Sequence, residues 1–221
     1  MKFYKKININ SVKKILLVFT IFLLTVGCGK DNDEPQRPTV NNKAFPFIKV
    51  GNEWVYEYSD NNKDTTYTYK VNILSEKDGY FTVQQGNSNS YWYVINNYWK
   101  ENSDIPANPI KEGNIFLYGN SYVGQKWSSE CKTVTILVDD EVKTVKINWK
   151  SKVLSITDTV TVPAGTFIDC IKIYTYPVFS DSTINVASDN FHWYHKDVGL
   201  VMYDWMEGKI TRKLISKIFN K

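Results

Sequence analysis

The sequence predicts an all-β fold over residues 45–221, either an antiparallel open barrel or half-barrel or a β-sandwich. Two observations predict it. From Phe45 onward, short segments alternate apolar and polar side chains with a period of two residues, which suits a strand with one buried face. Clusters of Asn, Asp and Gly separate these segments, as turns would. Many short strands in one chain are typical of barrels and sandwiches.

Two hairpins are the clearest elements. In residues 65–75, tyrosine, valine and isoleucine alternate with polar residues, and Lys77-Asp78-Gly79 then turns the chain into residues 80–85. The second hairpin is expected at residues 133–150, about a turn at residues 139–141. Further strands are expected near residues 53–59, 90–100, 115–128, 152–162, 166–176, 190–196, 199–206 and 209–218. Five residues are expected in the core: Trp54, Trp127, Phe167, Ile171 and Trp193.

Aromatic residues gather in the expected strand 90–100, which contains Tyr91-Trp92-Tyr93 and Tyr98-Trp99. On one unbroken strand, Trp92 and Trp99 face opposite ways because they are seven residues apart. Trp92 would share its face with polar residues and is therefore the expected outward residue and candidate ligand-binding site. An exposed flat ring can stack on a glycan or contact an apolar ligand. The alternative is that these aromatics fill the core.

The N-terminus has the features of a bacterial lipoprotein signal peptide over residues 1–27. A head with five lysines precedes an apolar run, Ile15 to Val26, of about 12 residues, which is too short to span a bilayer. Gly27 then precedes Cys28, as signal peptidase II requires, so Cys28 is the predicted site of lipidation. The alternatives are an ordinary secretory signal or a short membrane anchor. The expected membrane partner is reached through this lipid alone.

Residues 28–44 form a predicted tether, since this polar, proline-containing stretch cannot bury enough apolar surface to fold. Lys30, Asp31, Asp33 and Glu34 follow the cysteine closely. They resemble the export signal of surface lipoproteins in the Bacteroidetes, although Asn32 interrupts the acidic residues. The resemblance implies a lipid anchor in the outer membrane with display at the cell surface. A tether facing the periplasm is the alternative.

Charge argues against a nucleic-acid partner. The formal net charge of the whole chain is +4, and loss of the five lysines of the signal peptide, which contains no acidic residue, leaves −1. The remaining domain therefore has no basic excess to attract a polyanion.

The sequence contains few signs of catalytic or metal chemistry. No GxSxG elbow, P-loop or CxxC motif occurs, so we expect no enzyme and no cofactor. His192 and His195 are the only histidines, and three residues apart on a strand they face opposite ways. Residues 60–64 begin like a calcium loop but lack its later glycine and glutamate, so a solvated turn and no metal are expected.

Two cysteines, Cys131 and Cys170, remain once Cys28 is lipidated. In an exported domain they are a candidate disulfide, which on the chain-entropy view would contribute roughly 4 kcal/mol by closing a loop of about 40 residues. The alternative is two buried thiols that behave as small apolar side chains.

Four segments carry a family resemblance: VGNEWVYEY at 50–58, YVGQKW at 122–127, TVPAGTFIDCIKIY at 161–174 and WYHKDVGLVMYDW at 193–205. Together they resemble the DUF3108-like families of uncharacterised Bacteroidetes lipoproteins. The resemblance implies an all-β, barrel-like or half-barrel fold and supplies no catalytic residues. Independently, Val162-Pro163-Ala164-Gly165 predicts a turn between two strands, since proline presets φ at its second position.

Three functions follow from these patterns. The leading hypothesis is a lipid-anchored, non-catalytic domain that binds a ligand or partner, for example a glycan. The alternative is a periplasm-facing half-barrel that carries a lipid or another apolar molecule, which a large interior cavity would favour. The third is a hydrolase without a recognisable motif, which converging polar residues in a deep cleft would favour.

Overall fold

The computed structural model describes residues 43–109, 112–129, 132–138, 141–180, 189–205 and 208–220. Within these ranges the chain forms thirteen strands and no helix, and every strand pairing is antiparallel. The predicted all-β fold is confirmed. The first seven strands are β1 (Glu53–Asp60), β2 (Thr65–Lys77), β3 (Tyr80–Gln85), β4 (Ser88–Ile95), β5 (Tyr98–Asn102), β6 (Asn114–Tyr118) and β7 (Lys126–Ser128). The others are β8 (Lys132–Val138), β9 (Glu141–Val162), β10 (Gly165–Phe179), β11 (Asn190–His195), β12 (Gly199–Trp205) and β13 (Ile210–Ile218).

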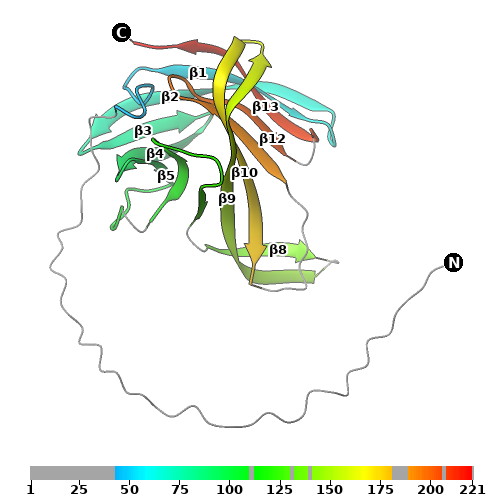
Figure 1. Cartoon of the computed structure of the whole chain (residues 1–221). Coiled ribbons are helices and arrows are strands. Elements are labelled where there is room, and N and C mark those ends of the chain that lie inside the picture. The colour runs from blue at the N-terminus through cyan, green and yellow to red at the C-terminus, as the bar shows by residue number, and fades with distance from the viewer. Residues whose placement is uncertain are drawn as a thin grey trace, which may run out of the picture. The chain divides into compact units, whose positions relative to one another are not determined.

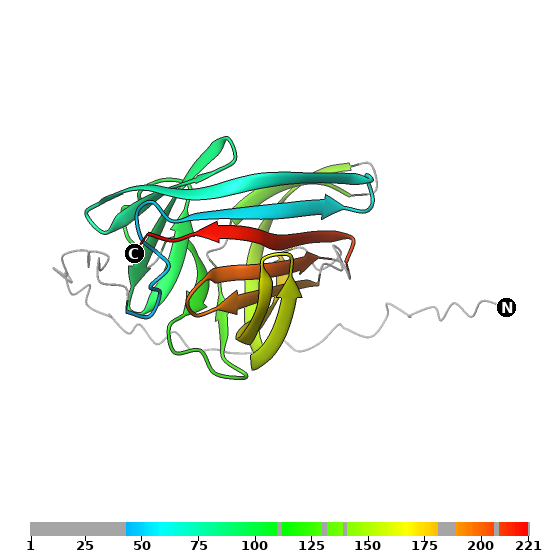
Figure 2. The same cartoon turned by 90° about the horizontal axis from the view of Figure 1, so that it is seen from above.

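All strands belong to one sheet that curls back on itself (Figures 1 and 2). The strand order is β6-β5-β4-β3-β2-β1-β13-β12-β11-β10-β9-β7, and β8 pairs with β9 beside this path. The two edges, β6 and β7, meet through a side chain: the indole Nε1 of Trp127 donates to the carbonyl of Ile115 at 3.1 Å. Its ring also lies 5.0 Å from that of Tyr118. The sheet is therefore a nearly closed barrel.

The hairpins form where turn residues predicted them. Between β2 and β3, Asp78 and Gly79 both have positive φ, 54° and 81°, as a two-residue hairpin turn of the favoured twist requires. Pro163 and Ala164 join β9 to β10, and Val162 pairs with Gly165 across that turn. The predicted hairpin of residues 133–150 is formed by β8 and β9, while residues 139 and 140 lie outside the described part of the chain.

The prediction of a single strand over residues 90–100 is wrong, because β4 and β5 form a hairpin there. Asn96 and Asn97 have φ of 50° and 64° and form a two-residue turn between β4 and β5. Asparagine tolerates this backbone region better than most residues, so the pair reverses the chain without a glycine. The reversal changes the face on which every later residue lies, because Val94 is paired with Trp99 across the hairpin.

Trp92 therefore points inward, which corrects the expectation that it faces outward. Both Trp92 and Trp99 are buried, with 7% and 2% of their surface exposed, and their ring centroids lie 4.8 Å apart. Among the five expected core residues, Trp54, Trp127 and Phe167 are buried, whereas Ile171 and Trp193 are only partly buried.

The turn between β9 and β10 lies over β12 and β13 (Figure 2). It is fixed there by a hydrogen bond from the amide of Ala164 to the carbonyl of Leu214, at 3.1 Å. Beside this turn is a set of buried apolar side chains that we call the hairpin-tip core: Val160, Val162, Phe167, Cys170 and Val201.

Candidate functional site

Two adjoining cavities lie within the curled sheet. The larger one, the main cavity, has a volume of about 390 Å³, and the smaller one, the side cavity, about 250 Å³. Four residues line both: Phe116, His192, Tyr194 and Tyr203. The main cavity falls within the volume range of small-molecule sites, which starts near 300 Å³.

The alternation of side chains along the strands explains why this cavity is aromatic. Residues two apart on a strand share a face, and several such pairs point into the main cavity. From β1 these are Trp54, Tyr56 and Tyr58; from β11, His192 and Tyr194; from β12, Tyr203 and Trp205; and from β13, Ile210 and Arg212. Trp92, Trp99 and Phe116 complete the aromatic wall from β4, β5 and β6.

Arg212 is the one lining residue of the main cavity, within the described chain, that carries a permanent charge. Its guanidinium carbon lies 5.1 Å from the ring centroid of Tyr69, 5.8 Å from that of Tyr203 and 5.9 Å from that of Tyr56. These distances are typical of cation–π contacts, which partly offset the cost of placing a cation among apolar groups. No carboxylate of the described residues lies within ion-pair distance of Arg212.

His192 is held in its neutral form. Burial first, and then the nearby positive charge of Arg212, lower the pKa of His192 to about 3. Its ring stacks parallel to that of Tyr194 at 6.0 Å and lies 4.9 Å from that of Tyr203. His195 contacts Phe167 instead, at 5.7 Å, and lines neither cavity. The two histidines are thus separated, as their spacing predicted.

The tyrosines around Arg212 also stay neutral. Burial raises the pKa of Tyr69 and of Tyr203 to about 12, although Arg212 opposes the shift in both. Burial raises the pKa of Tyr56 and Tyr194 as well. The main cavity therefore offers neutral hydroxyl and imidazole groups around a single positive charge.

Some polar atoms of the cavity wall are hydrogen-bonded within the protein. Trp54 Nε1 donates to the carbonyl of Val198 at 2.7 Å, and the Tyr56 hydroxyl donates to the carbonyl of Leu200 at 2.8 Å. The indole Nε1 of Trp92 donates to Glu101 Oε1 at 3.2 Å.

Three donors of the same wall have no acceptor among the described residues. They are the buried atoms Trp99 Nε1, Trp205 Nε1 and Arg212 Nε. Buried polar atoms in native proteins are nearly always hydrogen-bonded, so an unpaired one often marks a place where water, an ion or a ligand binds. All three are donors on side chains that line the main cavity, but each of these nitrogen atoms has almost no accessible surface, so the side chain would have to shift before an acceptor in the cavity reached it.

The candidate residues from the sequence have different outcomes. Trp92 lines the main cavity, but as a buried residue and not as part of an exposed platform. The lipidation site Cys28 and the export-signal residues Lys30, Asp31, Asp33 and Glu34 lie outside the described residues and remain predictions.

The cysteine pairing also remains a prediction, because Cys131 lies outside the described residues. Cys170 is buried and is present as a free thiol, whose Sγ lies 3.6 Å from the carbonyl oxygen of Phe167. Burial raises the pKa of this thiol to about 11, which keeps it protonated and unreactive at neutral pH.

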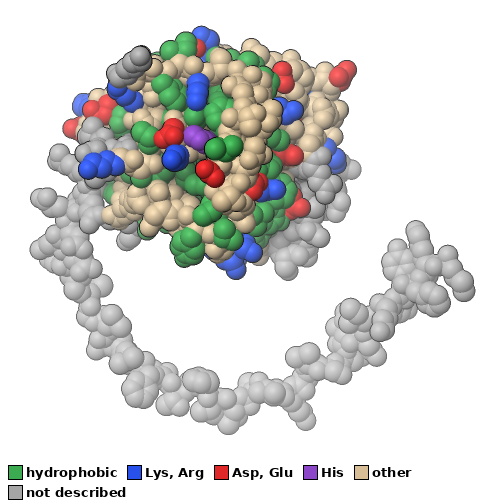
Figure 3. All heavy atoms as spheres, turned by 45° about the horizontal axis from the view of Figure 1, so that its top comes forward, with side chains coloured by type: hydrophobic (Ala, Val, Ile, Leu, Met, Phe, Trp, Pro, Cys, Tyr) green, Lys and Arg blue, Asp and Glu red, His purple; other side chains and the backbone are tan. Residues whose placement is uncertain are grey.

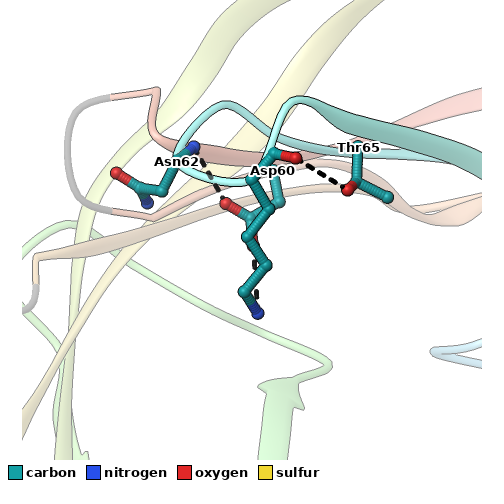
Figure 4. A network of polar contacts seen from close by, with 4 residues as sticks. Asp60, Asn62 and Thr65 are labelled. Atoms are coloured by element: carbon teal, nitrogen blue, oxygen red, sulfur yellow. Dashed lines mark hydrogen bonds and ion pairs between the residues drawn. The ribbon is translucent and has the colours of Figure 1, made fainter.

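The loop that begins like a calcium site is a closed turn (Figure 4). Asp60 Oδ1 accepts from the amide of Asn62 at 3.0 Å, and Asp60 Oδ2 lies 3.5 Å from Lys63 Nζ. The Thr65 hydroxyl donates to the carbonyl of Lys63 at 3.1 Å. The carboxylate of Asp60 is thus used inside the turn. Across the described part of the chain, no cluster of three or more His, Cys, Asp or Glu side chains could hold a metal.

Sequence reasoning missed Arg212 and His192 as cavity residues. The signal for Arg212 was present: it lies two residues after Ile210 and two before Leu214, both of which are buried on β13. A cation between two buried apolar residues of the same strand face indicates either a buried contact or a binding site.

Figure 3 shows acidic and basic side chains interspersed with apolar ones on one face of the molecule. In the ranges that the structure covers, no helix is both long and apolar enough to cross a membrane.

Comparisons with known proteins give limited information. No family model matches the chain, and neither does any curated protein. Two solved structures are similar: a protein from Bacteroides fragilis described as a candidate exported protein with a YmcC-like fold, and a candidate lipoprotein from Parabacteroides distasonis. The first has 12% identity and a TM-score of 0.43, the second 16% and 0.46; each match covers 79% of this chain and 98% of the other. Membership of the DUF3108-like families stays a prediction.

Proposed function

We propose that this protein is a lipid-anchored, non-catalytic binding protein that holds a small, largely apolar molecule inside its curled sheet. The observation that carries the proposal is the main cavity of about 390 Å³, whose wall is formed mainly by Trp, Tyr, Phe, Val, Leu and Ile side chains. Concave, mostly apolar cavities with a few polar groups are typical of small-molecule sites.

The burial of the aromatic residues supports one of the two ligand classes considered from the sequence. A glycan platform needs rings that are open to solvent, yet Trp92 and Trp99 are buried and contact each other. An apolar carrier needs rings that surround a space, and both of these line the main cavity. The cavity therefore favours the carrier over the surface glycan binder.

The same wall supports a non-catalytic role. The ring of His192 contacts the rings of Tyr194 and Tyr203, both of which stay protonated, and the thiol of Cys170 is buried away from the cavity. A histidine beside two weak phenolic acids does not form the nucleophile, base and orienting acid of a hydrolase.

Uptake of a neutral fluorescent probe such as N-phenyl-1-naphthylamine tests the proposal. The wild-type domain should bind about one probe per chain with increased fluorescence. Leu200→Trp should lose most of this binding, because Leu200 lines the main cavity and a larger side chain would fill it. Leu74→Trp is the matched control, since Leu74 is 48% exposed and lines neither cavity.

Near-ultraviolet circular dichroism of both variants would verify that they fold. Probe binding by Leu200→Trp at wild-type affinity would place the site outside the main cavity. A wild type that ignores the probe but changes its tryptophan fluorescence with a glycan would overturn the proposal in favour of a glycan-binding surface.

The anchor is a separate part of the proposal and rests on the residues before the sheet. Cys28 follows a small residue behind an apolar run of signal-peptide length, and the thiol is needed for lipid attachment. Lys30, Asp31, Asp33 and Glu34 support display at the surface of the outer membrane. Cys28→Ala should abolish palmitate labelling and membrane attachment; labelling that persists in the variant would contradict the anchor.

Protease treatment of intact cells tests the side of the membrane. The wild-type domain should be degraded, whereas Lys30→Ala combined with Asp31→Ala, Asp33→Ala and Glu34→Ala should be protected if these residues direct export. Equal protection of both forms would indicate a periplasm-facing tether.

A further inference from the structure

Arg212 has an environment that its cation–π contacts do not fully explain. Three tyrosine rings, Tyr56, Tyr69 and Tyr203, surround its guanidinium carbon at 5.1 to 5.9 Å. Ring faces attract the positive charge but accept no strong hydrogen bond in the guanidinium plane. The Nε atom is buried and has no acceptor among the described residues. A structural arginine is normally paired through such donors with a carboxylate or carbonyl oxygen.

The unpaired donors of this cavity come from different strands. Arg212 is on β13, Trp205 on β12 and Trp99 on β5, and all three side chains line the main cavity. Each has a buried nitrogen that could donate and has no partner in the described chain. Leaving a buried donor unpaired is costly, and an acceptor in the cavity would satisfy it once the side chain turned toward the cavity.

The charge of the cavity has one sign. The described residues that line the main cavity include Arg212 and no aspartate or glutamate. His192 beside it is neutral, because burial and Arg212 itself lower its pKa to about 3. The charge of Arg212 is therefore not compensated within this cavity.

Glu101 is a carboxylate near this wall, and its hydrogen bonds are made with residues other than Arg212. Its Oε1 atom accepts from Gln85 Nε2 at 2.6 Å, from the Ser90 hydroxyl at 2.7 Å and from Trp92 Nε1 at 3.2 Å. Glu101 does not line the main cavity, and it forms no ion pair with Arg212 among the described contacts. These contacts fix Trp92 in the wall and leave Arg212 available to a ligand.

We propose that Arg212 binds the carboxylate of an amphipathic monoanion, with an apolar chain or ring system against the aromatic wall of the main cavity. This inference rests on the proposed function and names its ligand class. The planar guanidinium fork matches a carboxylate in two parallel hydrogen bonds. One cation also balances one negative charge, whereas a phosphate monoester would bring a second charge that no lining residue of the described chain offsets.

Two probes that differ in the head group alone test the inference: dodecanoate and dodecan-1-ol, both below their aggregation limits, added as competitors of the neutral fluorescent probe. The wild type should bind dodecanoate roughly tenfold or more tightly than the alcohol, as expected for hydrogen bonds to a charged group. Arg212→Met should bind both with similar affinity, because it keeps an unbranched apolar stem and removes the charge and donors.

Lys213→Met is the matched control. Lys213 is the next residue on β13, faces the other way and lines neither cavity, so its removal should leave the preference for the acid intact. Arg212→Lys keeps the charge but not the planar fork, and should retain part of the preference. Should Arg212→Met not fold, the acid and alcohol can still be compared on the wild type and on Arg212→Lys.

The outcomes separate this inference from the proposed function. Equal affinity of the wild type for acid and alcohol would refute the role of Arg212 and leave the apolar cavity site standing. Tighter binding of dodecyl phosphate than of dodecanoate would overturn the carboxylate assignment. Failure of all three amphiphiles and of the neutral probe to bind would refute the proposed function together with the inference.

Discussion

The hairpin-tip core and the main cavity are both built from residues of the same sheet and share one hydrophobic cluster, yet they differ in open volume and in unpaired polar atoms. Phe167, Cys170 and Val201 are buried in the hydrophobic core, and the Cys170 thiol faces the carbonyl of Phe167. Lys217 Nζ and the His195 ring lie against the ring of Phe167, at 5.0 and 5.7 Å. The wall of the main cavity is aromatic, encloses about 390 Å³ and contains a cation and unpaired donors.

The difference indicates a division of roles. Close packing without unpaired polar groups is what stabilises a fold, so the hairpin-tip core is a source of stability. An uncompensated cation beside open volume does not stabilise the folded state by itself. Residues that lower stability in this way are typical of sites that bind a ligand. Mutations in the two regions should therefore affect different quantities: the free energy of unfolding in the first and ligand affinity in the second.

The largest expected effect is that of Phe167→Ala in the hairpin-tip core. Removal of this buried ring should lower the free energy of unfolding by about 3–5 kcal/mol, because the lost apolar contacts leave a cavity. Urea unfolding measures the loss. Ile168→Ala is the matched control: this neighbour is 63% exposed, and its truncation should change stability by no more than about 0.5 kcal/mol. Equal losses in both variants would mean that Phe167 is not part of a packed core.

The second expected effect is a pH dependence of the free energy of unfolding, caused by His192 in the wall of the main cavity. His192 has a pKa of about 3 in the folded chain against 6.5 in its unperturbed form. Below pH 6.5 the unfolded chain takes up a proton that the folded chain does not, so stability falls as the pH decreases towards 3; above pH 6.5 the residue contributes nothing. The loss should be about 1.7 kcal/mol between pH 6.5 and 5.0, because the slope approaches about 1.4 kcal/mol per pH unit only as the histidine of the unfolded chain becomes fully protonated.

His192→Gln should remove this part of the pH dependence, and unfolding of both forms in urea at pH 6.5 and 5.0 measures it. His195→Gln should keep the part that comes from His192, although burial also lowers the pKa of His195 and this variant should lose a smaller pH dependence of the same sign. If the wild type and His192→Gln lose stability in parallel, His192 is protonated in the folded state and the main cavity is more polar than its wall indicates.

The local parts of this fold were predictable and the site was not. Two turns can be predicted from residue type alone. Asp78-Gly79 tolerates the positive φ that its turn needs, and the ring of Pro163 presets φ in the turn with Ala164. The alternating pattern instead places Asn96-Asn97 inside a strand, and the turn that the structure has there reverses the orientation expected for Trp92 relative to Trp99. Because a hairpin restarts the alternation of faces, one turn error places every later residue of the segment on the wrong face.

The main cavity depends on pairings between strands far apart in the sequence. Arg212 meets Tyr56 because β13 pairs with β1, and both lie near Tyr69 because β1 pairs with β2. No local pattern specifies that pairing. The local sequence shows one unusual feature of this site: Arg212 shares a strand face with the buried apolar residues Ile210 and Leu214 on β13.

The third expected effect comes from Trp54→Phe. This change keeps most of the ring but removes the Nε1 hydrogen bond to the carbonyl of Val198, which is 2.7 Å long and buried. The carbonyl would then lack that donor, so the free energy of unfolding should fall by about 1–3 kcal/mol. Thermal and urea unfolding measure the change; a neutral result would mean that water replaces the lost donor.

The smallest effect should be that of Trp99→Phe, the counterpart of Trp54→Phe in the same aromatic cluster. Both indoles are almost fully buried, at 2% and 1% exposed, and both rings contact Phe47 and Trp92. Trp99 Nε1, however, has no acceptor among the described residues, so its removal forfeits no hydrogen bond within the protein and relieves an unpaired buried donor. The smaller ring still loses some apolar contact.

We therefore expect Trp99→Phe to stay within about 1 kcal/mol of the wild type and to be more stable than Trp54→Phe by about 1 kcal/mol or more. Because the two substitutions remove the same atoms from similar surroundings, the difference between them isolates the hydrogen bond from the packing. Equal losses would show that the Trp99 indole is as well satisfied in solution as that of Trp54. In that case Trp99 would no longer count among the unpaired donors of the main cavity, and the acceptor expected of the ligand would rest on Arg212 and Trp205 alone.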